Sequence, residues 1–295
     1  GPMGQIGGNI NSVVLAIAGS RRIFEFLEEE PEDYSGSVEK VVKNINGEEK
    51  YFWHDIESDE YRELLGDIRF NDVTFSYDGE NKVLKNLNLY AKPGQKVAFV
   101  GATGAGKTTI TNLINRFYEI DSGVITFDGI DIRKIKKDDL RSSLGMVLQD
   151  THLFTGTIAE NINYSVNDID MEKTIEAAKR TNAHDFIKNL KDGYDTVITG
   201  AGGELSEGQM QLLSIARAEI YNPPVMILDE ATSSIDSRTE KIVQEGMDEI
   251  MKGRTTFVIA HRLSTIMNSD VIIVLENGEI IERGDHEDLL EQKGI

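Results

Sequence analysis

The sequence of 295 residues lacks cysteine, long apolar runs and an excess of basic residues. Without cysteine it has neither a disulfide nor a thiolate metal site, which fits a reducing compartment. The nearest candidate for a membrane span, Val13 to Ala18, is far shorter than the roughly 18 apolar residues that a span needs. The formal net charge of -20 argues against nucleic acid as a partner, because a phosphate backbone needs a basic binding surface.

A glycine-rich loop is the strongest positive signal. Residues 101–109 read GATGAGKTT and follow the apolar run 96–100, which gives the phosphate-binding pattern G-x-x-x-x-G-K-[ST] after a strand. The glycines let consecutive N–H groups surround a polyphosphate, Lys107 would contact the β and γ phosphates, and Thr108 would offer its hydroxyl to Mg²⁺. The pattern predicts an ATP or GTP site. The predicted nucleotide contacts in this loop are Gly101, Thr103, Gly104, Ala105, Gly106, Lys107, Thr108 and Thr109.

A second motif supplies carboxylates. In residues 224–230, four apolar residues precede Asp229 and Glu230, which is typical of a buried strand with acids at its carboxyl end. Asp229 would hold Mg²⁺, and Glu230 would act as the general base on the water that attacks the γ phosphate. The alternative is a surface acid pair after a core strand.

From Gly66 onward the sequence predicts an α/β fold: a P-loop NTPase core with an antiparallel β subdomain and an inserted α-helical subdomain at about residues 150–220. The expected strands are 68–75, 83–90, 96–100, 124–127, 146–148, 225–228, 255–259, 271–275 and 279–282. The expected helices include 109–117, 137–144 and 171–178.

The first 65 residues differ in character. Gly1 and Pro2 before Met3 resemble a tag remnant, and apolar residues at helical spacing follow up to about residue 30. They indicate either a docked amphipathic helix or the tail of a longer helix. Residues 31–65 are rich in acids and predict a solvated linker. Within it, the aromatic residues 51–53 are expected to pack on the surface of the 66–295 domain.

Residues 205–209, LSEGQ, resemble the LSGGQ signature of ATP-binding cassette (ABC) transporters. Other elements of that family follow in its order. Tyr77 resembles the aromatic that stacks on adenine, and Gln149 resembles the glutamine that contacts Mg²⁺ and water. Asp236 lies in a segment that resembles the loop facing the opposite subunit, and His261 resembles the histidine that binds the γ phosphate.

The resemblance implies two nucleotide-binding domains that meet head to tail, each signature closing on the ATP of the other. Ser206 would cap the helix at 207–220, and Gly208 and Gln209 would help to form an anion site at its N-terminus. ATP would join the dimer and hydrolysis would loosen it. The implied partner is therefore a second nucleotide-binding domain, from the same or a homologous chain.

Two further segments resemble bacterial exporters of the multidrug or lipid half-transporter type. Residues 24–31 resemble the junction after the last membrane helix, and residues 150–158 resemble the stretch that contacts the coupling helices of the membrane domain. This resemblance implies a transmembrane domain as partner and a place at the cytoplasmic face of the cell membrane. Residues 1–30 would include the tail of the last transmembrane helix, and the present chain would be soluble.

Three places depart from the family pattern: Glu207 replaces the first signature glycine, Met210 replaces a basic residue, and residues 199–202, TGAG with Ala201, stand where exporters often carry Gly-Glu-Arg-Gly. An acid near a bound phosphate is unfavourable unless it points away, so the pattern is also compatible with a heterodimer that has one weaker site. Two alternatives are a binding module of low hydrolytic activity, against which Glu230 argues, and a soluble, non-transport ABC ATPase, which would lack the exporter-like junction at residues 24–31. A small-molecule kinase would share only the phosphate loop.

Overall fold

The computed structural model describes residues 2–164, 168–199, 203, 205–229, 237–260 and 262–291, with the backbone alone for 2–9 and 237. The chain forms two compact units, residues 1–34 and 35–295. The first contains a single helix, α1 (Pro2–Leu27), whose apolar side chains at Val13, Val14 and Ile17 are exposed. Within the described ranges, no helix has both the length and the apolar content for a membrane crossing.

The centre of the second unit is a six-stranded sheet in the order β15-β14-β6-β13-β12-β9. Its strands are β6 (Lys96–Val100), β9 (Leu144–Val147), β12 (Val225–Asp229), β13 (Thr255–Ile259), β14 (Val271–Glu276) and β15 (Glu279–Gly284). All neighbours pair in parallel except β15, which is antiparallel to β14. Along β6, Val97 and Phe99 enter one hydrophobic core and Ala98 enters another. Burial on both faces explains the continuous apolar runs in the sequence.

An antiparallel sheet covers the core that contains Val97 and Phe99, as predicted. It contains β4 (Ile68–Ser76), β5 (Lys82–Ala91), β7 (Ser122–Phe127) and β8 (Ile130–Asp131) in the order β5-β4-β7-β8. Helix α2 (Lys107–Ile114) contributes Ile110 and Leu113 to this core. The chain continues through η1 (Ile132–Lys134) and α3 (Lys137–Arg141). The predicted helix at 137–144 is too long, because Leu144 already begins β9.

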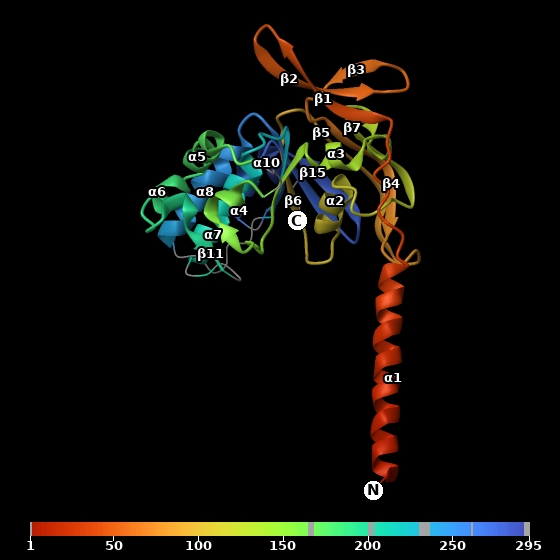
Figure 1. The fold of residues 1–295 in the computed structure, drawn as a ribbon. Coiled ribbons are helices and arrows are strands. Elements are labelled where there is room, and N and C mark those ends of the chain that lie inside the picture. Colours follow the sequence, from red (N-terminus) through yellow and green to blue (C-terminus); the bar gives the residue numbers. More distant parts are fainter. Residues whose placement is uncertain are drawn as a thin grey trace. The chain divides into compact units, whose positions relative to one another are not determined.

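Helices cover the core that contains Ala98 (Figure 1), which confirms the predicted helical insertion. They are α4 (Ile158–Ile162), α5 (Met171–Arg180), α6 (His184–Ile187), η2 (Gly193–Asp195), α7 (Glu207–Glu219) and α8 (Ser237–Met251). Short strands β10 (Gly156–Thr157) and β11 (Val197–Ile198) pair among them, and α9 (Leu263–Met267) and α10 (His286–Glu291) follow later. At the end of α7, the buried Glu219 carboxylate pairs with Arg180 and Arg254. This ion-pair network ties α5 to the chain that enters β13.

The structure differs from the predicted solvated linker at residues 31–65. A three-stranded antiparallel sheet lies there, formed by β1 (Val38–Ile45), β2 (Glu48–Asp55) and β3 (Glu60–Glu63). Asn46 and Gly47 join β1 to β2 with φ of 55° and 89°, the left-handed pair that a two-residue type I′ turn requires. The sheet belongs to the same unit as the rest of residues 35–295 (Figure 1).

One buried carboxylate joins this sheet to the domain. The Trp53 side chain is fully buried, and its Nε1–H donates to Oδ2 of Asp128 at 3.0 Å. The backbone N–H of Leu65 donates to the same oxygen, while those of Gly66 and Asp67 donate to Oδ1. Because buried donors are costly when unpaired, this set of bonds fixes where β3 ends and β4 begins.

We predict that Asp128→Asn lowers the free energy of unfolding by about 2 to 4 kcal/mol, because the amide nitrogen would face donors that the lost oxygen accepts. The matched control is Glu63→Gln at an exposed position of β3, which should change the free energy by less than about 0.5 kcal/mol. Urea unfolding followed by tryptophan fluorescence measures both. Equal effects of the two variants would contradict the anchoring role of Asp128.

Candidate functional site

The loop between β6 and α2 has the close backbone approach that the glycine pattern predicts. At Gly101, with φ 152°, a Cβ would lie 2.2 Å from the Leu275 carbonyl oxygen of β14. At Gly106, with φ 105°, a Cβ would lie 2.7 Å from Cδ2 of Leu84. Only glycine fits both positions without displacement of a neighbour. The loop is therefore held against the sheet on one side and against β5 on the other.

Lys107 opens α2 and bends back over the loop. Its Nζ donates to the carbonyl oxygens of Gly101 at 2.6 Å and Ala102 at 2.9 Å. Burial lowers the pKa of the Lys107 ammonium, and the charge of Asp229 acts in the opposite direction. The Asp229 carboxylate therefore interacts electrostatically with the Lys107 ammonium, the group that is predicted to contact phosphate.

A pocket of about 470 Å³ opens beside the loop. The residues that line it are Tyr77, Val83, Thr103, Gly104, Gly106, Lys107, Thr108, Thr109, Gln149, Asp229 and Ile259. Four separate segments thus contribute predicted site residues to one cavity. Gly101 and Ala105 belong to the loop but are not among the lining residues in the part of the chain that the structure describes.

Tyr77 lies at this pocket with about half of its surface exposed. Its hydroxyl is 3.1 Å from Oγ1 of Thr109. Edge-on contacts with Phe75 and Tyr118, at centroid distances of 4.8 and 4.9 Å, hold the ring in place. A fixed and partly exposed aromatic ring suits stacking against a planar base.

The oxygen atoms at the pocket suit a hard cation. Thr108, Gln149 and Asp229 supply a hydroxyl, an amide and a carboxylate, which are ligand types that Mg²⁺ accepts alongside water and phosphate. Within the described ranges, no group of three or more His, Cys, Asp or Glu residues could form a complete metal cage.

The LSEGQ segment begins α7, away from this pocket. Oγ of Ser206 accepts from the Gln209 N–H at 3.3 Å, and Oε1 of Gln209 accepts from the Ser206 N–H at 3.0 Å. This capping box confirms the predicted cap. Gly208 is buried, Glu207 is exposed, and none of these residues lines the pocket among the described parts of the chain.

Three predicted site residues lie outside the described residues: Glu230, Asp236 and His261. The same holds for Ala201, one of the departures from the family pattern. Val83 and Ile259 line the pocket although the sequence analysis did not select them. Val83 begins an expected strand and Ile259 ends another, so neither carried a signal beyond strand propensity.

The stretch that resembles the membrane-domain contact forms an exposed aromatic surface. The rings of Phe154 and Tyr164 stack at a centroid distance of 3.9 Å, and both are exposed. The Arg217 guanidinium lies 5.6 Å from the Phe154 ring centroid and donates to the Asn161 carbonyl oxygen at 2.8 Å. Because Arg217 belongs to α7, this surface is attached directly to the helix that LSEGQ begins.

Comparison with known proteins gives consistent matches. The profile of the ABC transporter family matches residues 84–233. An uncharacterized ABC transporter ATP-binding protein of Bacillus subtilis is 45% identical over 296 residues, covering 100% of this chain and 46% of that protein. An ATP-dependent lipid A-core flippase of Syntrophus aciditrophicus is 45% identical over 284 residues, covering 96% of this chain and 44% of that protein.

A solved structure of a bacterial Atm1-family ABC exporter with ATP bound superposes with a TM-score of 0.77 and 36% identity. It covers 97% of this chain, which corresponds to 46% of the exporter chain. The chain therefore spans less than half the length of these relatives.

We predict that Gly101→Ala lowers the free energy of unfolding by roughly 3 kcal/mol or more, because the methyl group would overlap the Leu275 carbonyl. Gly104→Ala is the matched control, since it shares a positive φ but has open space around the added Cβ. Its cost should be about 1 to 2 kcal/mol, from the backbone conformation alone. Urea unfolding of both variants checks the difference, and equal costs would disprove the close contact with β14.

Proposed function

The chain belongs to the ABC transporter family, and we propose that it is the domain of an ABC exporter that binds and hydrolyses ATP to drive transport. The single observation that carries this proposal is the pocket that combines the phosphate loop with Tyr77, Gln149 and Asp229. The exporter names of the relatives and the ATP-bound neighbour support it. Because those proteins are about twice as long, transport itself belongs to a larger protein.

In this proposal each segment of the pocket has its own role. Tyr77 stacks on adenine, and the loop N–H groups with Lys107 hold the β and γ phosphates. Thr108, Gln149 and Asp229 orient Mg²⁺, directly or through water. Bound Mg²⁺ would offset the negative charge that phosphoryl transfer spreads over the phosphate oxygens.

Hydrolysis needs residues beyond the loop. We assign Glu230 as the general base that takes a proton from the attacking water, and His261 as a donor to the γ phosphate. Both assignments rest on the family resemblance of their segments. Gln149 would contact both Mg²⁺ and the attacking water, so it would orient this water toward Glu230.

A second nucleotide-binding domain would complete the site. Ser206 and Glu207 at the start of α7 are exposed and do not line the chain's own pocket in the part that the structure describes, and the capping box leaves a helix N-terminus that favours an anion. In a head-to-tail dimer this N-terminus would meet the γ phosphate of the partner. Asp236 would contribute from the loop that faces the opposite subunit.

The membrane domain would dock on the aromatic surface of Phe154 and Tyr164. Two exposed stacked rings form an apolar contact, and Arg217 connects them to α7. Movement of a coupling helix on this surface would therefore reach the signature helix directly. The full protein would place this domain at the cytoplasmic face of the membrane.

Glu207 favours one variation on this function. It occupies the first turn of α7, where its charge would face a partner's γ phosphate in a homodimer. Repulsion there would favour pairing with a different chain that carries a glycine at this position. The composite site that contains this LSEGQ would then hydrolyse ATP slowly.

We predict that Tyr77→Ala weakens ATP binding about tenfold, as expected for the loss of one base-stacking contact. Tyr77→Phe keeps the ring and loses only the hydroxyl near Thr109, so its affinity should stay within about twofold. Titration calorimetry with Mg-ATP measures both. An unchanged affinity in Tyr77→Ala would remove Tyr77 from the adenine site.

The test of the proposed function is sedimentation of Glu230→Gln combined with Glu207→Gly, with and without Mg-ATP. This double variant should bind ATP without turnover and carries a complete signature, so ATP should convert monomer to dimer. The same double variant with Lys107→Ala added is the control and should stay monomeric. An absence of ATP binding by the parent chain would contradict the proposal.

The same measurement tests the role of Glu207. If Glu207 opposes self-pairing, Glu230→Gln alone should remain monomeric with ATP, whereas Glu230→Gln with Glu207→Gly should dimerise. Full dimerisation of Glu230→Gln with Glu207 in place would contradict the preference for a different partner chain.

A further inference from the structure

The C-terminal end of α2 has an unusual closure. Arg116 takes the left-handed conformation with φ 51°, which costs a residue with a side chain about 1 kcal/mol or more. Its N–H bonds to the Leu113 carbonyl at 3.0 Å, and the Phe117 N–H bonds to the Asn112 carbonyl at 3.0 Å. This is the Schellman pattern, here with arginine where glycine is usual. Other contacts are therefore needed to stabilise the left-handed conformation of Arg116.

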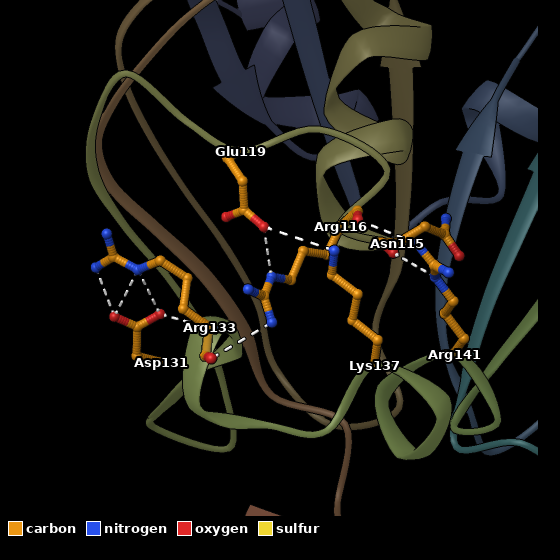
Figure 2. A network of polar contacts seen from close by, with 7 residues as sticks. All are labelled: Asn115, Arg116, Glu119, Asp131, Arg133, Lys137 and Arg141. Carbon is orange, nitrogen blue, oxygen red and sulfur yellow. Dashed lines mark hydrogen bonds and ion pairs between the residues drawn. The ribbon is translucent and has the colours of Figure 1, made fainter. Parts of the chain in front are cut away.

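Arg141 supplies that restraint from another helix. Its Nε donates to the Asn115 carbonyl oxygen at 3.3 Å and its Nη2 to the Arg116 carbonyl oxygen at 3.2 Å. The guanidinium also lies 5.1 Å from the centroid of the Phe117 ring. A cation at the C-terminus of a helix is favourable, and the planar group spans two carbonyls at once. Figure 2 shows Arg141 directed at this helix end.

Further contacts fix Arg116 at the end of α2 and helix α3, which carries Arg141 (Figure 2). Nε of Arg116 lies 2.8 Å from Oε1 of Glu119, and its Nη1 donates to the Arg133 carbonyl oxygen. The buried Lys137 of α3 lies 3.9 Å from the same Glu119 oxygen. At the C-terminal end of α3, Nζ of Lys40 in β1 donates to Ser142. Arg141 thus projects from a helix that is fixed at both ends.

The two elements that Arg141 joins both lead to the pocket. Helix α2 begins with Lys107 and Thr108, which line it. Helix α3 ends at Arg141, β9 runs from Leu144 to Val147, and Gln149 follows at the pocket. Since α2 has only eight residues, about 12 Å of rigid helix, a shift at its C-terminus reaches its N-terminus.

We propose that Arg141 is a positioning residue that sets the separation between Thr108 and Gln149, and through it the binding of the magnesium–nucleotide complex. The proposal rests on the proposed function of the pocket. Arg141 is not one of the described residues that line the pocket and acts only through α2 and β9. Its loss lets α2 shift relative to the Gln149 segment, so the oxygens contributed by Thr108 and Gln149 no longer fit one metal ion.

The experiment compares ATP dissociation constants measured by calorimetry in Mg²⁺ and in EDTA, using the whole 295-residue chain. The dissociation constant in EDTA divided by the dissociation constant in Mg²⁺ reports how much the metal strengthens ATP binding. In Arg141→Gln this ratio should fall by roughly 5- to 50-fold, a range expected when a remote change misplaces binding groups. Arg141→Lys keeps the charge but not the two-carbonyl geometry and should lie between Arg141→Gln and the parent.

The matched control is Arg133→Gln. It removes an equal charge from the same cluster, where Arg133 pairs with Asp131 at the surface, and the carbonyl that Arg116 uses is kept. Its ratio should equal that of the parent. Urea midpoints show whether each variant is folded at the assay conditions.

Three results would overturn the inference: an unchanged ratio in Arg141→Gln, an equal fall in Arg133→Gln, or a parental ratio in Arg141→Lys. The last would assign the effect to charge at the helix end alone. A parent chain that binds no ATP under either condition would instead contradict the proposed function, so the two failures are distinguishable.

Discussion

The pocket depends on the parallel pairing of β6 between β13 and β14. Phe99 lies opposite Ile259 on one side and Ile273 on the other, and both faces of the sheet are buried. Parallel strands bring their carboxyl ends to one edge. The phosphate loop after β6, Asp229 at the end of β12 and Gln149 after β9 therefore meet there, although they are far apart in sequence.

Much of the fold could be predicted because the central strands are apolar runs with turn residues beside them. The predicted bounds of β6 and β13 agree with the structure. The end of α2 could not be predicted, since Arg116 adopts a conformation that arginine rarely takes, and the contacts of Arg133 and Arg141 that help to hold it come from residues remote in sequence. The β1–β3 sheet had one local signal, Asn46-Gly47, but the acidic composition around it favoured a linker. The burial of Trp53 depends on Asp128, which is remote in sequence.

Residues of the candidate site could be predicted from the sequence where phosphate or metal binding requires a particular residue type. Glycines, Lys107 and Asp229 belong to patterns with a physical reason, whereas Tyr77 and Gln149 were found only through family resemblance. Arg141 had no signal, because a cation that acts on backbone carbonyls of another helix has no fixed spacing to them.

The hairpin turn at Asn46 and Gly47 has a practical consequence. It lies at the tip of a sheet that is joined to the domain through Trp53 and Asp128, and the tip residues Ile45 to Glu48 are exposed. A fluorophore or an epitope inserted at the tip would leave those anchoring contacts and the pocket lining intact. The hairpin is therefore a suitable position for a label with which to follow this domain in binding experiments.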